Sequence, residues 1–211
     1  MTDDVRDSYD DVAELYASLF LNELDQDTIA LDWIHRFAGL VGDADALVAD
    51  LGCGPGQLVR YLEELGLTAV GYDLSSGQVA QARATFPDSH FEVGDFADLG
   101  VADSSLGGVV ARYSIIHLLP TRLARVFEYW HRLLAPGAPV LISFFASTAA
   151  ETHGRPFDHA VVTAYELFPE TVARHLHDAG FVDVEIGVQP PPDGGRPFNQ
   201  GTVLARTPPV R

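Results

Sequence analysis

The sequence is poor in cysteine and in basic residues, and it lacks a long apolar run. The single cysteine, Cys53, excludes an internal disulfide, and histidines without nearby cysteines argue against a structural zinc site. No apolar stretch approaches the roughly 20 residues that a membrane helix needs. The chain also does not open on a charged segment followed by an apolar one, as a signal peptide would. We therefore expect a cytoplasmic protein that does not bind membranes.

Thirteen basic residues stand against 30 acidic ones, which gives a net charge of −17. A chain this acidic repels phosphate backbones, so nucleic acid is not an expected partner. Part of the acidic excess is local, because five aspartates crowd the beginning: Asp3, Asp4, Asp7, Asp10 and Asp11. We interpret this cluster as a solvated segment that favours a helix N-terminus, rather than as a metal site.

Residues 48–56 (VADLGCGPG) carry the most informative pattern of the chain. They predict the end of a buried strand, a turn with glycine at every second position, and the start of a helix. Gly52, Gly54 and Gly56 allow a sharp turn and the close approach of a ligand, because no Cβ stands in the way. The helix N-terminus that follows favours negative charge. The pattern predicts a site for a nucleotide-like or amino-acid-like cofactor.

A second predicted strand, at 68–73, ends in Asp73, roughly 20 residues after the glycines. At this offset a carboxylate can bind a ribose, because it accepts both hydrogen bonds of a vicinal diol. The pattern fits NAD as well as S-adenosylmethionine, and a helix cap is the simpler alternative for Asp73. NAD sites favour G-x-G-x-x-G, whereas here the third glycine comes one position earlier. Asp50, directly before the glycines, suits a ligand that carries an ammonium group.

Four segments in order resemble one protein family. The stretch D-L-G-C-G-P-G at 50–56 closely resembles the first motif of class I S-adenosylmethionine-dependent methyltransferases. F-E-V-G-D-F at 91–96 looks like the third-strand motif of that family, and residues 107–118 (GGVVARYSIIHL) look like its fourth strand. Residues 123–142 resemble the following helix, turn and fifth strand, with Ala138 in place of the last glycine of the turn. The resemblance covers roughly residues 45–145.

This resemblance implies S-adenosyl-L-methionine as the cofactor and S-adenosyl-L-homocysteine as the product. The backbone around Gly52 and Gly54 would approach the methionine part, and Asp73 would hold the ribose. Asp95 and Phe96 would hold the adenine, although simple packing is an alternative for Phe96. The cofactor-binding residues expected are Asp50, Gly52, Cys53, Gly54, Gly56, Asp73, Leu74, Asp95, Phe96 and Arg112. Within this set, Leu74 would cover the adenine, Arg112 would act through its main chain, and Cys53 would fill space.

The order of predicted elements favours an α/β protein. Strands at 47–51, 68–73, 90–93, 107–113 and 139–145 alternate with helices at 56–65, 76–85 and 121–135. This alternation predicts a doubly wound, Rossmann-like sandwich around a mostly parallel sheet. A helix at 166–179 follows, and then strands at 181–188 and 201–206 that the turn at 190–195 joins into an antiparallel hairpin. Family resemblance implies seven strands with the last one antiparallel.

We expect a single domain over residues 1–211. Two amphipathic segments, at 12–20 and 28–38, predict a helical cap within residues 1–40. Residues 45–145 would form the cofactor-binding core, and residues 146–165 an insertion over the acceptor site. Residues 166–211 would add a helix and the terminal strand hairpin.

His117 is the candidate general base, because it follows the fourth predicted strand and a neutral imidazole accepts a proton near pH 7. A capping or packing role is the alternative. Tyr16, in the first amphipathic segment, is a second candidate, which would fold over the cofactor or simply belong to an apolar stripe. Aromatic residues and histidines at 144–165 suit a small aromatic or apolar acceptor. Among them, His153 and His159 are interpreted as solvated side chains rather than metal ligands, so no metal is expected.

Two other functions compete with methyl transfer to a small molecule. An NAD-dependent oxidoreductase would need a loop that accepts a pyrophosphate and a set of residues for hydride transfer, and neither is found. A noncatalytic module would keep the fold but not the reaction, and the intact glycines together with Asp73 and Asp95 argue against it.

Overall fold

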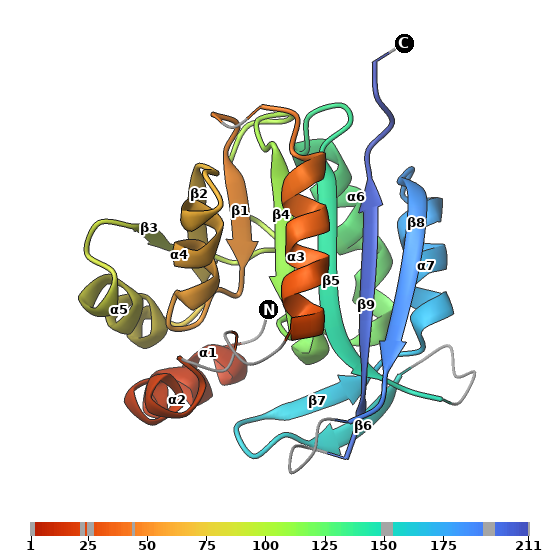
Figure 1. Ribbon diagram of the computed structural model, residues 1–211. Helices are drawn as coiled ribbons and strands as arrows, with labels where there is room; N and C mark the ends of the chain where they lie inside the picture. Colours follow the sequence, from red (N-terminus) through yellow and green to blue (C-terminus); the bar gives the residue numbers. More distant parts are fainter. Residues whose placement is uncertain are drawn as a thin grey trace.

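A seven-stranded sheet forms the centre of the protein in this computed structural model, which describes residues 3–21, 24, 28–43, 45–148, 154–191 and 197–210 (Figure 1). Its strands are β1 (Val48–Leu51), β2 (Ala69–Asp73), β3 (His90–Val93), β4 (Gly108–Arg112), β5 (Pro139–Ala146), β8 (Val182–Gln189) and β9 (Asn199–Arg206). They lie in the order β3-β2-β1-β4-β5-β9-β8. β9 runs antiparallel to both neighbours, whereas the pairs among β1 to β5 are parallel. The predicted α/β fold, with a mostly parallel sheet and an antiparallel last strand, is confirmed.

Helices cover both faces of this sheet (Figure 1). α3 (Thr28–Leu40), α4 (Gln57–Glu64) and α5 (Ser76–Thr85) lie on one face, and α6 (Leu123–Leu133) and α7 (Pro169–Asp178) lie on the other. Successive residues of a strand point to opposite faces. Thus Val109 and Ala111 pack with α6 and α7, while Val110 packs with α3 and α4. Burial on both faces explains why the strands read as short apolar runs.

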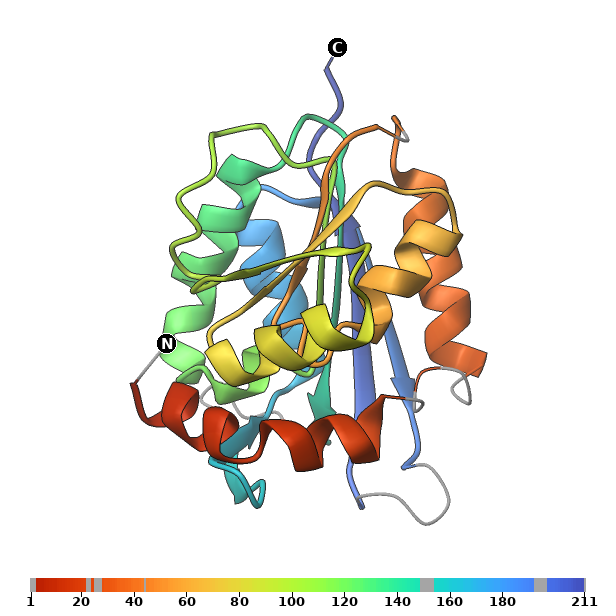
Figure 2. The same cartoon turned by 90° about the vertical axis from the view of Figure 1, so that its left-hand side faces the viewer.

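The remaining elements gather at the carboxyl ends of the parallel strands (Figure 2). They are α1 (Asp3–Asp11), α2 (Ala13–Phe20) and a separate hairpin of β6 (Arg155–Asp158) and β7 (Thr163–Glu166). α1 and α2 pack against α5. In an open α/β sheet this end is where ligands bind.

The structure adds detail to two expectations about these outer elements and corrects a third. The acidic segment at 3–11 is the helix α1, in which Asp3, Asp4, Asp7 and Asp11 are exposed as expected, whereas Val5 is 4% exposed and packs inward. Much of the insertion at 146–165 is the β6–β7 hairpin. The helix expected from 166 begins only at Pro169, because residues up to Glu166 pair within that hairpin.

Other boundaries shift by a few residues. Short 3₁₀ turns, η2 (Ile115–His117) and η3 (Pro120–Arg122), precede α6, so the helix expected from 121 begins at Leu123. The antiparallel pair of β8 and β9 forms as predicted, although β9 begins two residues earlier than expected. Most of the turn expected at 190–195 lies outside the described residues. None of the helices in the described ranges is both long and apolar enough to cross a membrane.

Candidate active site

A cavity, which with the solvent space at its mouth measures about 530 Å³, opens at the carboxyl ends of β1, β2 and β4, beneath α1 and α2. Small-molecule sites are concave and mostly apolar, with a few polar groups, and the residues around this cavity fit that description. The lining residues are Val5, Arg6, Tyr9, Tyr16, Gly52, Gly54, Asp73, Leu74, Ser75, Gln78, Phe96, Arg112, Tyr113, Ser114 and His117. Eight of the twelve site residues expected from the sequence are among them. The other four, Asp50, Cys53, Gly56 and Asp95, lie outside the lining.

The carboxylate of Asp73 joins the two turns that form the floor of the cavity. Its Oδ2 accepts a hydrogen bond from the backbone N–H of Gly54 at 2.9 Å, and its Oδ1 accepts one from the N–H of Ser75 at 2.9 Å. Burial raises the pKa of Asp73, and these two N–H groups oppose that rise. Each carboxylate oxygen keeps a further lone pair, so Asp73 can still accept hydrogen bonds from a diol in the cavity.

The three glycines of the turn all have positive φ, but they serve different purposes. A Cβ on Gly52 would lie 2.4 Å from Cβ of Ser114, and a Cβ on Gly56 would lie 2.7 Å from the ring of Phe91. Both glycines are therefore required by packing within the protein. A Cβ on Gly54 would meet no protein atom closer than 3.8 Å. Since Gly54 lines the cavity, its missing side chain leaves room for a ligand.

The backbone N–H groups of this turn are used within the protein. Those of Gly52 and Cys53 donate to the carbonyl of Tyr72, at 2.7 and 3.0 Å, and that of Gly54 donates to Asp73. A pyrophosphate needs such N–H groups to be free. The N–H groups of Gly52, Cys53 and Gly54 are therefore not available to a pyrophosphate.

Asp50 and Cys53 support the site from beneath. Asp50 is 2% exposed, and burial raises its pKa to about 7, opposed by the charge of Arg112 and aided by that of Asp73. Burial also raises the pKa of the Cys53 thiol well above its ordinary value. The sulfur of Cys53 fills the space beside Gly71, which agrees with its interpretation as a space-filling residue.

Phe96 and Asp95 follow β3 and face different surroundings. Phe96 is 3% exposed, lines the cavity and packs edge-on against Trp130. The carboxylate of Asp95 accepts a hydrogen bond from the N–H of Ala97 at 2.9 Å, within a tight turn outside the lining. The placement of Phe96 suits one face of a flat ring.

His117 is held in one orientation by two partners. Its Nδ1 lies 3.3 Å from the carbonyl oxygen of Thr163 in β7, and its Nε2 lies 2.8 Å from the hydroxyl of Tyr9 in α1. A carbonyl only accepts, so Nδ1 carries the proton and Nε2 of the neutral ring accepts from Tyr9. The sequence predicted His117 and Tyr16 as candidate catalytic residues, whereas the tyrosine that contacts His117 is Tyr9. Tyr16 lines the cavity and packs its ring against Tyr9 and Phe20.

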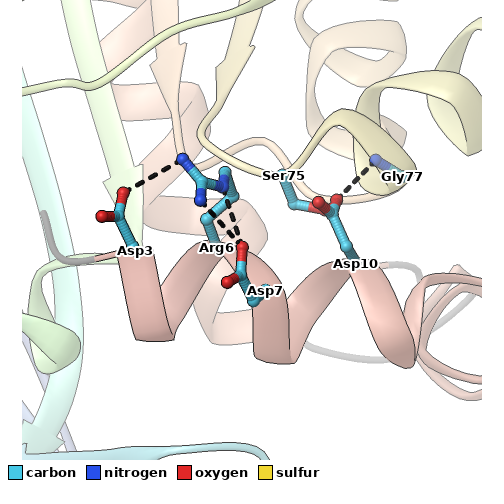
Figure 3. Close-up of polar contacts among 6 residues, drawn as sticks. All are labelled: Asp3, Arg6, Asp7, Asp10, Ser75 and Gly77. Carbon is cyan, nitrogen blue, oxygen red and sulfur yellow. Dashed lines mark hydrogen bonds and ion pairs between the residues drawn. The ribbon is translucent and has the colours of Figure 1, made fainter.

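Asp10 fastens α1 to the start of α5 (Figure 3). Its Oδ1 accepts from the hydroxyl of Ser75 at 2.6 Å and from the N–H of Gly77 at 2.7 Å. Burial would raise the pKa of Asp10, but these two donors outweigh it and hold the pKa below its ordinary value. One turn earlier, Arg6 lines the cavity and pairs with Asp3 and Asp7 of the same helix (Figure 3).

The contribution of α1 to the site, from Val5, Arg6, Tyr9 and Asp10, was not predicted from the sequence. A signal was present, because Val5, Tyr9, Ala13 and Ala17 recur every four residues and extend the amphipathic pattern back to residue 5. The high aspartate content of this segment concealed it. Ser75, Gln78, Tyr113 and Ser114 are further lining residues that the expected set did not include.

An aromatic wall lies next to His117. The ring of His159 is 5.2 Å from that of His117, centroid to centroid, and packs against Phe145 and Phe157. Tyr113 packs on Phe145, and Phe198 packs on both Phe145 and Phe157. His159 is 7% exposed, so its interpretation as a solvated side chain was wrong. His153 lies outside the described residues.

Comparison with known proteins identifies relatives in one family. Residues 48–137 match the model of a methyltransferase domain. A demethylmenaquinone methyltransferase of Beutenbergia cavernae is 31% identical over 210 residues, which cover 84% of this chain and 82% of that protein. An uncharacterized methyltransferase of Synechocystis sp. is 31% identical over 90 residues. That alignment covers 43% of this chain and 42% of the relative, so the chain spans less than half of its length.

The fold is also found among solved structures. Magnesium protoporphyrin IX methyltransferase from Synechocystis PCC 6803, whose crystal structure contains bound S-adenosylmethionine, aligns with a TM-score of 0.72. The two chains are 19% identical, and the alignment covers 98% of each. At this level of identity the likeness establishes the fold alone.

The substitution Asp10→Asn should loosen α1. It removes the charge that strengthens two hydrogen bonds, which are worth about 1.5–3 kcal/mol each when one partner is charged. Backbone amides of α1 should therefore exchange with solvent roughly 10–100-fold faster in a hydrogen-exchange measurement. Asp11→Asn makes the same charge change at an exposed position of the same helix and should leave exchange unchanged. Equal exchange in both variants would show that Asp10 does not fasten the helix.

The substitution Asp50→Asn should change how stability depends on pH. The folded pKa of about 7 lies above the ordinary value of 3.8, so ionising Asp50 disfavours the folded state as pH rises from about 4 to 7. The difference between these two pKa values corresponds to a loss of at most about 4 kcal/mol in the free energy of unfolding. The unfolding free energy of the variant, minus that of the wild type, should increase over this range and then level off. Urea titrations from pH 4 to 9 measure it, with Asp88→Asn as the exposed control; a flat difference would contradict the prediction.

Proposed function

Because this chain belongs to the S-adenosylmethionine-dependent methyltransferases, we propose that it methylates a small aromatic or apolar molecule that loses a proton in the reaction. The observation that supports this proposal is the pairing of Tyr9 with His117 at the cavity, beside the aromatic wall. The acceptor would rest against that wall and direct its ionisable group towards Tyr9. The name of the Beutenbergia relative, a demethylmenaquinone methyltransferase, agrees with an aromatic acceptor.

The residues of the cavity fit S-adenosyl-L-methionine. Asp73 can accept the hydrogen bonds of the ribose diol, and Gly54 leaves room for the chain of the cofactor. Leu74 and Phe96 offer apolar surface for the adenine. Arg112, at the end of β4, would act through the position of its backbone. Asp50, beneath the glycine turn, would act through its charge.

When bound, the cofactor supplies an activated methyl group for transfer by in-line displacement. The protein contributes mainly by orientation, which can supply on the order of 7–11 kcal/mol. α1 and α2 line the cavity with Val5, Arg6, Tyr9 and Tyr16, which would shield a bound acceptor from water. The remaining task is to remove the proton of the acceptor.

Tyr9 and His117 can perform this task as a pair. Tyr9 lines the cavity, and its hydroxyl already donates to Nε2 of His117. As Tyr9 takes a proton from the acceptor, it passes its own to His117, whose Nδ1–H remains bound to the carbonyl of Thr163. The β6–β7 hairpin thus fixes the tautomer that lets Nε2 accept.

The proposed reaction can be tested with the purified protein and cofactor labelled with isotope at the methyl group. The acceptor panel should contain phenols and quinols, matched aromatic amines, and aliphatic carboxylic acids. Mass spectrometry should find the label in hydroxylated aromatic compounds. Label in the amines alone would contradict a mechanism that depends on deprotonation, and no label in any compound would favour a noncatalytic module.

Tyr9→Phe and His117→Ala should lower kcat by similar factors, about 10²–10⁴, because each interrupts the same proton transfer. The double variant should be little worse than either single one, since the two residues act as a unit. Binding of S-adenosylhomocysteine should stay within about twofold of wild type by isothermal titration.

Tyr61 provides a matched control for this experiment. Its hydroxyl pairs with His35 Nε2 at the same distance of 2.8 Å, on the exposed surface between α3 and α4. Tyr61→Phe should leave kcat unchanged. If Tyr9→Phe behaved like Tyr61→Phe while His117→Ala was impaired, Tyr9 would not carry the proton.

A further inference from the structure

Gln78 places a buried amide in the wall of the cavity. The side chain belongs to the first turn of α5, lines the cavity and is 1% exposed. Among the residues that the structure describes, neither its Nε2 nor its Oε1 has a hydrogen-bond partner. Burying an amide without partners costs folding free energy, because the group gives up its hydrogen bonds with water. The unsatisfied amide therefore points to a polar group that the cavity takes up.

The position of Gln78 identifies which part of the ligand it would meet. A Cβ on Gly54 would lie 4.0 Å from Oε1 of Gln78, and the N–H of Gly54 donates to Asp73. Ser75 links the same residues from the other side, because its N–H donates to Asp73 and its hydroxyl accepts from the N–H of Gln78 at 3.0 Å. Gln78 and Asp73 thus both line the cavity next to Gly54.

The two side chains have complementary chemistry. An ionised carboxylate only accepts hydrogen bonds, so Asp73 can take the protons of two hydroxyl groups but cannot satisfy their oxygens. A primary amide donates two hydrogen bonds and accepts others, whichever way it is turned. A vicinal diol beside Asp73 therefore needs a donor such as the Gln78 amide.

We propose that Gln78 recognises the ribose diol of the adenosyl cofactor together with Asp73, donating to one hydroxyl oxygen while Asp73 accepts the hydroxyl protons. This inference rests on the proposed cofactor and adds a second ribose-specific residue to the site. It explains why a polar side chain is buried at this position of α5, where an apolar one would pack without cost.

The test combines a variant with modified ligands. Gln78→Leu removes both polar atoms at similar volume, and Gln81→Leu makes the same change on the same helix outside the cavity lining. Binding of S-adenosylhomocysteine and of its 2′-deoxy and 3′-deoxy analogues is measured by isothermal titration for the wild type and both variants. Melting temperatures of the ligand-free proteins are recorded in parallel.

Gln78→Leu should bind S-adenosylhomocysteine about tenfold more weakly than the wild type. In the wild type, one of the two deoxy analogues should bind more weakly than S-adenosylhomocysteine. In Gln78→Leu this difference in affinity should be about tenfold smaller. Gln81→Leu should behave as the wild type. The melting temperature of ligand-free Gln78→Leu should equal or exceed that of the wild type, because an unsatisfied amide is gone. Should Gln78→Leu fail to fold, Gln78→Met replaces it in the same measurements.

The outcomes separate the inference from the proposed function. A wild-type protein that does not bind S-adenosylhomocysteine would overturn the cofactor itself. A wild-type protein that binds it, with Gln78→Leu binding equally well, would overturn only the role of Gln78. The same conclusion would follow if Gln78→Leu bound S-adenosylhomocysteine more weakly but lost as much affinity as the wild type with each deoxy analogue. Gln78 would then not contact the diol.

Discussion

The site depends on the hydrogen bonds that the carboxylate of Asp73 accepts. This carboxylate joins the glycine turn after β1 to the turn after β2 by accepting from the N–H groups of Gly54 and Ser75. Ser75 extends the connection, because its hydroxyl donates to Asp10 of α1. Hydrogen bonds to an ionised group are about twice as strong as neutral ones, so the charge of Asp73 holds the two turns together and the charge of Asp10 holds α1 to them. The group expected to bind the ribose therefore also shapes the cavity before the ligand arrives.

The acidic residues at the carboxyl ends of the strands suit a positively charged cofactor. Asp10, Asp50 and Asp73 lie at or beneath the cavity in a chain whose net charge is −17. A sulfonium cofactor with an ammonium group brings positive charge, which an acidic environment attracts, whereas a pyrophosphate would be repelled. Because Asp50 is buried, part of its charge is suppressed near neutral pH. The acidic composition that argues against nucleic acid thus favours this class of cofactor.

The core of the site could be predicted because its signals are local in sequence. Gly54 and Asp73 follow directly from the strands that carry them, and His117 follows β4. The partners of these residues could not be predicted in the same way. Tyr9 is 108 residues from His117, and Asp10 is 65 residues from Ser75. A helix with many aspartates looks solvated until it is known which of them face another element.

The sequence alone determined the alternating elements, the parallel sheet and the edge at which a ligand binds. Strands buried on both faces must be short and apolar, and a turn with repeated positive φ needs glycine. Only the tertiary structure decided what each residue of that turn does. Gly52 and Gly56 avoid collisions with Ser114 and Phe91, which lie far along the chain, and Gly54 alone of the three leaves space in the cavity. Such contacts depend on how distant segments pack, and the pattern of a single segment does not contain that information.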